Sequence, residues 1–574
     1  MTAEEKAKFW LAQDIDQESK EQIQYLVDNN PEELEEVFYK DLEFGTGGLR
    51  GIMGVGSNRM NIYTVSMATQ GLANYLNNTF INQNICVAIA YDSRNNSQLF
   101  AETAAKVFAG NDIKVHLFSA LRPTPQLSYA IRELGCKAGV VITASHNPKE
   151  YNGYKAYWDD GAQLTAPHDQ NVIDEAGKIS SFEQIKSVEE SELIELISED
   201  FDQDYIDAIK SLALDTKSIS EGNDINIVYS SIHGTGITLI PKTLEQLGFS
   251  NVHIVEQQAE PNGNFPTVVY PNPEEANALA LGIELAKEKE ADLLMATDPD
   301  ADRVGVAIKD DKGEYILLNG NQMASLMVYY ILKTRKALDT LKKSQYVVKT
   351  IVTSELIDTM CDKYSIPCYN TLTGFKYIAT TIRELEGKMQ FIGGGEESYG
   401  FMTSAIVRDK DAVAACSLIA EMAASAKASG GSLFDMMQDM YNHFGVWHED
   451  MQSITIKGKA GQEEIANMMK TFRANPPVSL GGSKVVKVLD YQNQTEDDKL
   501  NNVTTKLDFP ASNVLQFITE KGYKISARPS GTEPKIKFYF SVSESVANEE
   551  QIESVTERLK ALVGQIKKEL NLPS

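Results

Sequence analysis

The feature that most constrains this chain is a recurring alternation of short β-type runs and helical runs, in which each series ends in a polar loop. The first series has β-type runs at 85–91, 114–118 and 138–143, with helical spacing at 97–109 and 126–134. Strands that alternate with helices predict a parallel sheet with crossover connections. Ligands of such sheets bind beyond the carboxyl ends of strands, so the loop after residue 143 is a candidate for chemistry.

The same alternation returns twice further along the chain. The second series predicts strands at 225–229, 252–255 and 292–297, and helices at 237–247 and 274–288. The third series predicts strands at 346–352 and 390–392, and helices at 321–333, 355–362 and 412–426. Each series delivers a polar loop from the end of a strand, and we expect the three loops to converge on one crevice.

The pattern changes near residue 450, where strands of a mixed sheet are predicted at 453–457, 485–490, 513–519, 523–527 and 535–542, followed by a helix at 549–570. At about 150 residues per domain, 574 residues predict about four domains. The expected fold class is α/β, with three successive mixed α/β-sheet domains and a smaller C-terminal α+β domain around a central cleft. We place the boundaries at 1–212, 213–320, 321–450 and 451–574.

Composition excludes several classes of partner. The net charge is −27, which argues against nucleic acid and anionic membranes. There is no apolar run of about 18 residues and no apolar signal-peptide core in residues 1–20, so a cytoplasmic location is expected. Oligomeric state cannot be predicted. An anionic substrate needs local cations in such an acidic protein, and these must be found in the sequence.

The five cysteines are scattered and form no CxxC pair. Nothing in their spacing predicts a disulfide framework or a zinc site, and buried reduced thiols are expected.

Ser145 lies in the segment TASHNP, directly after a strand predicted to be buried. A serine there can be a nucleophile or a phosphoryl carrier, although a loop serine making local turn hydrogen bonds is the simpler alternative. The neighbouring His146 is expected to point away, because adjacent side chains of an extended chain diverge. No GxSxG elbow surrounds the serine, which argues against a hydrolase.

The segment DPDADR places Asp298, Asp300 and Asp302 at alternate positions, so an extended loop would aim three carboxylates to one side. Three close like charges need a cation, and oxygen ligands suit Mg²⁺ or Ca²⁺. An EF-hand is disfavoured because Arg303 and Lys309 occupy its glycine and acid positions. Mg²⁺ usually completes its shell with phosphate, which Arg303 could clamp. A solvated acidic turn is the alternative.

Three further loops carry polar groups. GGGEES offers Glu396 and Ser398 for sugar hydroxyls, although a helix cap would explain it equally well. In RPSGTEP, Arg528 provides a bidentate fork, and the next polar residues can form an anion-binding nest with two hydroxyls. The cations that an anionic substrate requires are therefore present near these loops: Arg50, Lys155, Arg303, Lys376, Lys410, Arg528 and Lys535.

The ordered set TASHNP, DPDADR, GEES and RPSGTEP resembles the α-D-phosphohexomutase superfamily, and within it the phosphoglucomutase/phosphomannomutase branch. FGTGGLRG (44–51) and TGFK (373–376) are also similar to that branch. The resemblance extends from about residue 40 to the end. It implies four domains around a central cleft and an enzyme that interconverts hexose 1-phosphate and hexose 6-phosphate.

The resemblance also implies roles for individual residues. Ser145 would be the phosphoserine, and with Asp298, Asp300 and Asp302 it would hold Mg²⁺. Arg303 would support the reacting phosphate, and His146 and Lys155 are candidates for proton transfer. Substrate-binding positions would be Arg50, Thr373, Gly374, Lys376, Glu396, Ser398, Lys410, Arg528, Ser530, Gly531, Thr532 and Lys535. The glycines of GGGEES are a departure from the family pattern, where a bulkier residue is expected.

The function expected from these features is an intramolecular phosphotransferase acting on a sugar phosphate, with glucose as the first choice and glucose 1,6-bisphosphate as the intermediate. Phosphomannomutase and phosphopentomutase specificities stay open. A sugar-phosphate phosphatase would use the same serine and metal, but would not need a separate phosphate cradle. A non-catalytic phosphosugar-binding protein would be expected to lack the nucleophile or a metal ligand, and bisphosphate synthesis is a further alternative.

Overall fold

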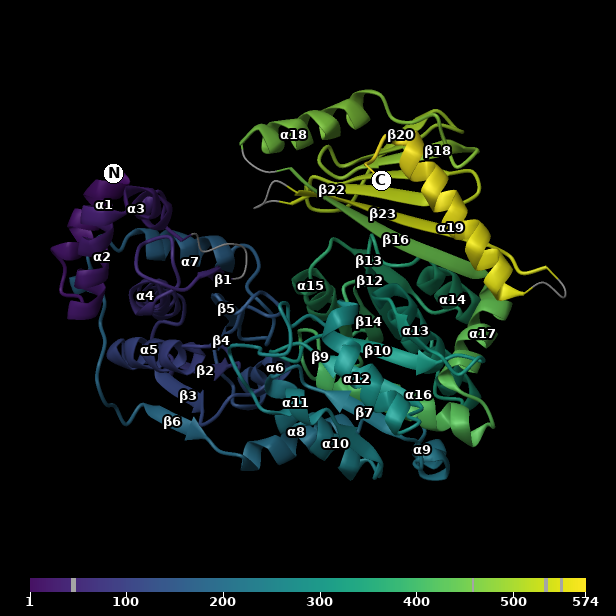
Figure 1. Cartoon of the computed structure of the whole chain (residues 1–574), viewed down its shortest axis with the longest axis horizontal. Helices are drawn as coiled ribbons and strands as arrows, with labels where there is room; N and C mark the ends of the chain where they lie inside the picture. The colour runs from purple at the N-terminus through teal and green to yellow at the C-terminus, as the bar shows by residue number, and fades with distance from the viewer. Residues whose placement is uncertain (43–47, 457–458, 531–534, 548–550, 574) are drawn as a thin grey trace.

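Four β-sheets follow one another along the chain, and each belongs to a separate structural unit (Figure 1). The structure is a computed structural model of the whole chain that describes all residues except 43–47, 457–458, 531–534, 548–550 and 574, with the side chains of 459–460 also left undescribed. In Figure 1 the first unit lies at the left, the C-terminal unit at the upper right, and the second and third units fill the right-hand body below it. We call them units 1 to 4.

Three helices precede the first sheet: α1 (Ala3–Leu11), α2 (Gln17–Asn29) and α3 (Pro31–Phe38). Each begins at a side-chain cap, provided by Thr2, Asp16 and Asn30, which accepts a backbone hydrogen bond from the first turn. Trp10 and Phe38 form the core of this helical layer and pack edge to face against each other, with ring centroids 5.7 Å apart. The layer covers one end of unit 1.

Unit 1 contains a six-stranded mixed sheet in the order β1-β5-β4-β2-β3-β6. Its strands are β1 (Gly48–Ile52), β2 (Cys86–Tyr91), β3 (Lys114–Phe118), β4 (Ala138–Ile142), β5 (Tyr151–Trp158) and β6 (Ile194–Ile197). Its helices are α4 (Ile62–Thr79), α5 (Ser97–Gly110), α6 (Thr124–Glu133) and α7 (His168–Gly177), and α8 (Asp200–Lys210) then packs into the core of unit 2. The two faces of the sheet bury separate clusters of apolar side chains.

Unit 2 contains a five-stranded sheet in the order β11-β10-β9-β7-β8. The strands are β7 (Ile227–Ser230), β8 (Val252–Ile254), β9 (Leu293–Thr297), β10 (Val304–Lys309) and β11 (Tyr315–Leu318). The helices are α9 (Thr216–Gly222), α10 (Ile240–Gln246), α11 (Glu256–Ala259) and α12 (Ala276–Glu288).

Unit 3 contains a four-stranded sheet in the order β13-β12-β14-β15. The strands are β12 (Gln345–Thr350), β13 (Cys368–Thr371), β14 (Gln390–Gly395) and β15 (Phe401–Met402). The helices are α13 (Gly320–Ala337), α14 (Leu356–Tyr364), α15 (Phe375–Leu385), α16 (Ala412–Ala428) and α17 (Leu433–Phe444). Helix α16 is buried on nearly every side, since it packs against elements of both unit 2 and unit 3.

Unit 4 is built on an antiparallel sheet in the order β16-β23-β22-β21-β18-β19-β20, with β17 beside β18. The strands are β16 (Val446–Thr455), β17 (Ser479–Leu480), β18 (Ser483–Asp490), β19 (Thr495–Asp498), β20 (Val503–Lys506), β21 (Leu515–Thr519), β22 (Lys524–Pro529) and β23 (Lys535–Glu544). The helices are α18 (Lys459–Ala474) and α19 (Ile552–Glu569), and α19 lies across the sheet (Figure 1).

The expected fold class is confirmed: three mixed α/β sheets are followed by a β-rich C-terminal unit. One large apolar core runs through units 2, 3 and 4, whereas the sheet of unit 1 has clusters of its own. Within the described residues, no helix is long and apolar enough to cross a membrane.

Each polar loop turns the chain back on itself, which the sequence patterns do not predict. After β4, β9 and β14 the chain returns as the antiparallel neighbours β5, β10 and β15. The loop between β22 and β23 has the same character. We expected strands that end at a crossover and assigned no strand to 151–158, 304–309 or 401–402, because the alternation of strands and helices predicts a crossover and not a direct return. The loops are therefore held by hydrogen-bonded strands on both sides.

Candidate functional site

Three strand-end loops meet where units 1, 2 and 3 face one another. Each contains a residue other than glycine with a left-handed backbone: Ser145 (φ 53°), Ala301 (φ 50°) and Tyr399 (φ 66°). This conformation is uncommon for side-chain-bearing residues and persists only where the surroundings fix it. Direct contacts join the loops. Thr124 at the start of α6 donates its backbone N–H to the Asp300 carbonyl at 2.9 Å, and Arg303 forms a β-bridge with Gly400.

Ser145 lies at the centre of this junction and is only 4% exposed. Its hydroxyl donates to Asp298 Oδ2 at 2.9 Å, and its backbone N–H donates to Thr143 Oγ1 at 2.9 Å. His146 Nδ1 lies 3.2 Å from the same hydroxyl. The expectation that His146 points away is therefore wrong, because it assumed an extended chain and the backbone at residue 145 is left-handed.

Arg94 binds the backbone of the loop that contains Ser145, and the sequence motifs did not indicate it. Its guanidinium donates to the carbonyl oxygens of Ser145 at 2.5 Å and Asn147 at 2.6 Å. It also ion-pairs with Asp92 at 3.3 Å and lies over the Phe265 ring of unit 2. The only signal in the sequence is the run YDSR directly after a buried strand. A buried arginine bonded to loop carbonyls fixes the backbone that presents Ser145.

Asp298, Asp300 and Asp302 converge as their spacing predicts, with one carboxylate oxygen from each lying within 4.8 Å of the others. All three are buried. Burial, together with the charges of Asp300 and Asp302, holds the pKa of Asp298 well above its usual range. Burial also acts to raise the pKa of Asp300, but the ammonium of Lys155 outweighs it and keeps that pKa below its usual range.

Two lysines from opposite sides partly neutralise these aspartates. Lys155 Nζ, on β5 of unit 1, lies 2.7 Å from Asp300 Oδ2. Lys410 Nζ, between β15 and α16 of unit 3, lies 2.9 Å from Asp302 Oδ2. Oδ1 of Asp300 and Oδ1 of Asp302 have no hydrogen-bond partner. Buried carboxylate oxygens without partners are costly unless a cation binds them, so these residues fit a hard divalent ion such as Mg²⁺.

The guanidinium of Arg303 is held by acidic side chains. Its guanidinium contacts Glu274 Oε1 at 2.5 Å and Asp302 Oδ1 at 3.8 Å. Burial acts to lower its pKa, but Glu274 and the neighbouring aspartates raise it above the usual value. The backbone N–H of Arg303 donates to Asp298 Oδ1 at 3.0 Å, so this residue also fixes the orientation of one aspartate.

Glu396 contacts the TGFK segment (373–376) just before the start of α15. Its Oε1 accepts from the Gly374 backbone N–H at 2.5 Å, and Ser398 Oγ lies 3.4 Å from its Oε2. Burial raises the pKa of Glu396 to about 7, with the adjacent Glu397 acting in the same direction. Thr373 lies next to this pair in the chain. Lys376 diverges from it: its ammonium lies over the Tyr377 ring.

Unit 4 contributes a positively charged edge. Arg528 on β22 is directly opposite Lys537 on β23, and the backbone N–H of Ser530 donates to the Lys535 carbonyl at 2.7 Å. Like charges directly opposite each other destabilise a sheet unless an anion joins them. Burial, with help from Lys535, lowers the pKa of Lys537, while Glu274 and Glu397 counteract this. Lys537 was not identified from the sequence, and Gly531 and Thr532 lie outside the described residues.

Arg50 reaches the site from β1, where it pairs in register with Gly153. Its side chain is exposed. Burial lowers the pKa of His146 well below 6.5, and the positive charges of Arg303 and Arg50 lower it further. His146 is therefore neutral at neutral pH. Most of the FGTGG run before Arg50 lies outside the described residues.

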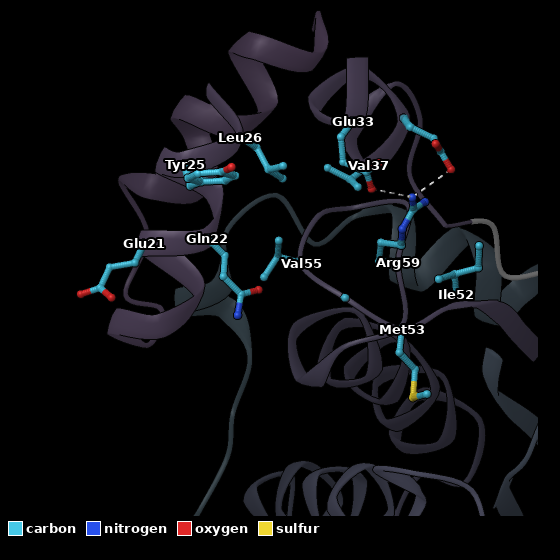
Figure 2. Close-up of a pocket in the computed structure, with 12 residues that line it drawn as sticks. Glu21, Gln22, Tyr25, Leu26, Glu33, Val37, Ile52, Met53, Val55 and Arg59 are labelled. Carbon is cyan, nitrogen blue, oxygen red and sulfur yellow. Dashed lines mark hydrogen bonds and ion pairs between the residues drawn. The ribbon is translucent and has the colours of Figure 1, made fainter. Parts of the chain in front are cut away.

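A hollow of about 680 Å³ lies away from these loops, between α2, α3 and the segment after β1 (Figure 2). Its rim carries Glu21, Glu33 and Glu36. Arg59 is the cation in its lining, and it is held by Glu36 at 3.0 Å and Glu33 at 3.5 Å. An anionic sugar phosphate would meet net negative charge there, so this hollow does not compete with the loop junction as the site.

Comparison with known proteins agrees with this geometry. Three successive models match: Phosphoglucomutase/phosphomannomutase, alpha/beta/alpha domains I, II and III, over residues 41–183, 203–313 and 319–444. A curated phosphoglucomutase of Staphylococcus epidermidis (strain RP62A) is 37% identical over 89% of this chain and 92% of its own length.

Solved structures are similar over nearly the whole chain. The open form of parafusin, a phosphoglucomutase from Paramecium, has a TM-score of 0.71 at 19% identity, covering 92% of this chain and 95% of its own. A phosphoglucomutase/phosphomannomutase family protein from Burkholderia thailandensis has a TM-score of 0.65 at 16% identity, covering 92% and 97%. At these identities the likeness concerns the fold.

Proposed function

Because the chain belongs to the phosphoglucomutase/phosphomannomutase family, which the resemblance of its four motifs had indicated, we propose that Ser145 is its phosphoryl carrier. The protein is an enzyme that interconverts hexose 1-phosphate and hexose 6-phosphate. The observation that supports the role of Ser145 is its position: the hydroxyl lies 2.9 Å from Asp298, within a group of three buried aspartates.

In the proposed reaction, the phosphoserine transfers its phosphoryl group to a hydroxyl of the sugar monophosphate. The hydroxyl oxygen forms a bond to phosphorus and the bond from phosphorus to Ser145 Oγ breaks. The proton of the sugar hydroxyl passes to a base, and the leaving Ser145 Oγ takes up a proton to become a hydroxyl again. His146 is placed to accept the sugar proton, since it is neutral at neutral pH and 3.2 Å from Ser145 Oγ, but its lowered pKa makes it a weak base. Lys155 is the alternative, and it already contacts Asp300.

The resulting bisphosphate, glucose 1,6-bisphosphate for glucose, turns over in the cleft and returns its other phosphoryl group to Ser145 by the reverse step. Catalysis of this kind depends mainly on positioning and on neutralisation of charge. Ser145, Asp298, Asp300 and Asp302 would hold Mg²⁺, which when bound would neutralise charge on the transferred group. Arg303 and Lys410 would add positive charge from the unit 2 and unit 3 sides.

The other end of the substrate is assigned to unit 4 and unit 3. Arg528, Ser530, Gly531, Thr532 and Lys535 would bind the phosphate that does not react, and the position of Lys537 opposite Arg528 adds it to this group. Glu396 would accept hydrogen bonds from the sugar hydroxyls, and Ser398 would donate hydrogen bonds to them. Arg50, Thr373, Gly374 and Lys376 would complete the binding surface.

The sugar itself is proposed to be glucose, in line with the curated relative named a phosphoglucomutase. Mannose and pentose phosphates differ at hydroxyls that these side chains do not resolve. We also propose a cytoplasmic enzyme that works on small sugar phosphates without nucleic acid or membrane partners. We propose the same domain boundaries as before: 1–212, 213–320, 321–450 and 451–574.

The decisive experiment is Ser145→Ala, assayed with glucose 1-phosphate, glucose 1,6-bisphosphate and Mg²⁺. We expect turnover to fall by at least about 10⁴-fold, since the covalent route is lost. Turnover near the wild-type rate would contradict the carrier role. The products of the wild type separate the alternatives: glucose 6-phosphate indicates a mutase, whereas free phosphate indicates a phosphatase. Mannose 1-phosphate and ribose 1-phosphate, tested in parallel, decide the sugar.

A further inference from the structure

Two cysteines and a histidine meet at the edge of the unit 1 sheet that is opposite to Ser145. Cys86 is the first residue of β2, His116 lies within β3, and Cys136 lies two residues before β4. Ser145 follows the other end of β4, so the five residues of that strand, about 17 Å, separate the two places. The cysteines are free, as expected, although Cys86 is only half-buried. Their spacing gave no sign of this group, because 30 and 20 residues separate members that the parallel sheet makes neighbours.

Strand register explains how the first two side chains come together. Cys86 pairs with Lys114 on β3, and the next residue but one, Ala88, pairs with His116. Side chains two residues apart on a strand share a face, so Cys86 and His116 lie on the same face. His116 is in turn directly opposite Glu195 on β6. The sheet therefore fixes three of these groups without help from a flexible loop.

Helix α6 delivers Cys136. The helix ends with Gly135 in the left-handed conformation (φ 64°), and the Cys136 backbone N–H donates to the Ile131 carbonyl at 2.8 Å. This is the Schellman ending, which turns the chain sharply into β4. The Lys137 N–H then donates to the Cys86 carbonyl at 2.8 Å, which fixes Cys136 beside β2.

One ligand atom from each of Cys86, His116 and Cys136 lies within 4.8 Å of the others. Bond lengths of about 2.0–2.3 Å place the ligand atoms of one metal ion at most about 4.6 Å apart, so these three atoms lie near the spacing of a metal site. Cys136 is buried, whereas Cys86 and His116 are half-buried, so the group opens to solvent on one side. Three donors and an open position match the arrangement of zinc sites that also bind water.

The surroundings favour a cation at this place. Cys86 Sγ lies 3.7 Å from the Gly135 carbonyl oxygen and 3.9 Å from that of Leu134, at the negative end of α6. Glu195 Oε2 lies 3.7 Å from His116 Nδ1, which is longer than a hydrogen bond, so a small movement of its exposed side chain would let it orient a metal-bound imidazole. Lys114 is a nearby opposing charge, and Glu195 Oε1 neutralises it at 2.8 Å.

We propose that Cys86, Cys136 and His116 bind a single Zn²⁺ ion, with water as the fourth ligand and Glu195 orienting the imidazole. Binding replaces the two thiol protons, which are released to solvent, with two sulfur–zinc bonds. Sulfur and imidazole ligands select Zn²⁺ over Mg²⁺, whereas the oxygen ligands of the aspartates favour Mg²⁺. The cysteine and histidine site is therefore expected to bind Zn²⁺, and the aspartate site Mg²⁺.

The ion would join strands β2 and β3 to the carboxyl end of α6. The amino end of the same helix contacts the metal-binding loop, where Thr124 Oγ1 donates to Asp300 Oδ2 at 3.1 Å. Zn²⁺ is therefore expected to raise the thermal stability of unit 1 and of the helix that supports the loop. It is not expected to take part in the reaction.

The test is a titration of reduced, metal-free, full-length protein with Co²⁺ in saturating Mg²⁺, which occupies the aspartate site. We expect one equivalent of Co²⁺ to produce a thiolate-to-cobalt charge-transfer band, and Zn²⁺ to abolish it by displacement. A carboxylate site cannot produce that band, so the readout is independent of the mutase reaction and of the role assigned to Ser145.

Variants locate the ligands. Cys86→Ser and Cys136→Ser should lose the band, and Glu195→Gln should bind about 10- to 100-fold more weakly, as expected for an outer-shell partner. Cys368→Ser is the matched control, because Cys368 is also a half-buried thiol that begins a strand, in unit 3. It should keep both band and stoichiometry. Mutase activity in Mg²⁺ shows that each variant is folded.

Three outcomes would overturn the proposal: no charge-transfer band in the reduced wild type, a band that survives Cys86→Ser, or a band lost in Cys368→Ser instead. Mass spectrometry of the same reduced sample adds a fourth. A disulfide between Cys86 and Cys136 that persists under the reductant would show that the thiols pair with each other and not with a metal.

Discussion

Two buried clusters of charge differ in how completely their groups are paired. The cleft cluster consists of Asp298, Asp300 and Asp302 with Lys155 and Lys410, at the junction of units 1, 2 and 3. The interface cluster joins unit 3 to unit 4 and consists of Lys349, Lys524, Glu355 and Asp358. Both are enclosed by protein, yet they serve different purposes.

The interface cluster balances two cations against two anions. Lys349 lies 2.9 Å from Glu355 and 2.8 Å from Asp358, and Lys524 contacts the same glutamate. Lys524 also donates to the Ile351 carbonyl at 2.8 Å, so it binds the backbone of unit 3 as well. Every charge in this cluster has an oppositely charged partner. It is a joint that holds the phosphate-binding edge of unit 4 against unit 3.

The cleft cluster has three anions against two cations, and Oδ1 of Asp300 and of Asp302 lack hydrogen-bond partners. Buried charge without complete pairing costs stability and is retained where function needs it. The comparison therefore teaches that incomplete pairing, rather than burial or the amount of charge, distinguishes the site from the joint. The four predictions below test that distinction.

The largest effect is expected at the joint. Glu355→Gln leaves two buried ammonium groups with one carboxylate. Breaking a fully buried pair costs about 3–5 kcal/mol, and the cost here is lower because the Glu355 side chain is 34% exposed. We expect a large fall in the midpoint of the first thermal transition, measured by calorimetry, while kcat at low temperature changes less than about 10-fold. The exposed Glu384→Gln should change neither. An activity loss without a stability loss would contradict the structural role of the cluster.

At the site we expect a large effect on activity and a small effect on stability. Asp302→Asn removes an aspartate whose Oδ1 has no partner, and Asp409 at 3.3 Å remains to pair Lys410. We expect kcat to fall by about 10²–10³-fold, as when one preorganised electrostatic group is lost. The unfolding midpoint without Mg²⁺ should change little, and its increase with added Mg²⁺ should disappear. Asp311→Asn, on an exposed turn, is the control, and a variant that is destabilised but active would reject this assignment.

A third test uses the two glutamates whose pKa is near 7. Burial raises the pKa of Glu449, beside the interface cluster, to about 7 from an unfolded value near 4.5. The folded state then binds more protons between these values, so stability falls as pH rises from about 4.5 through 7.

Glu449→Gln removes this linkage. We therefore expect the variant to exceed the wild type in stability above pH 7, by up to about 3 kcal/mol, with the difference vanishing near pH 4.5. Denaturant titrations across this range measure it. Glu520→Gln, exposed in the same unit, should retain the wild-type profile. Parallel profiles of stability against pH for the Glu449 variant and the wild type would contradict the prediction.

The smallest effect concerns Glu396 in the cleft, whose pKa is also about 7. A carboxylate accepts hydrogen bonds from sugar hydroxyls better when ionised, so kcat/KM should rise about 10-fold between pH 6 and 8. The substrate phosphate titrates in the same region, and Glu396→Gln separates the two causes. The variant should lose the part of the rise that belongs to Glu396, and an unchanged profile would assign the whole rise to the substrate.

Local patterns predicted the parts of the site that lie within one loop. Asp298, Asp300 and Asp302 could be found because alternate residues of a short loop share a direction, and that direction survives folding. Arg94 and Lys537 could not, because their meaning depends on loop carbonyls and on a strand partner. His146 was misjudged because a single left-handed residue reverses the geometry of an extended chain.

The sequence by itself determined the alternation of strands and helices, the order of the four loops and the chemical types that they carry. These follow from apolar periodicity and residue spacing, which are properties of short segments. Only the tertiary structure decided which charges are paired, which side chain holds the backbone of the serine loop, and that Cys86, His116 and Cys136 meet. Strand register and the packing of separate units decide those contacts, and both arise from interactions between residues far apart in the chain.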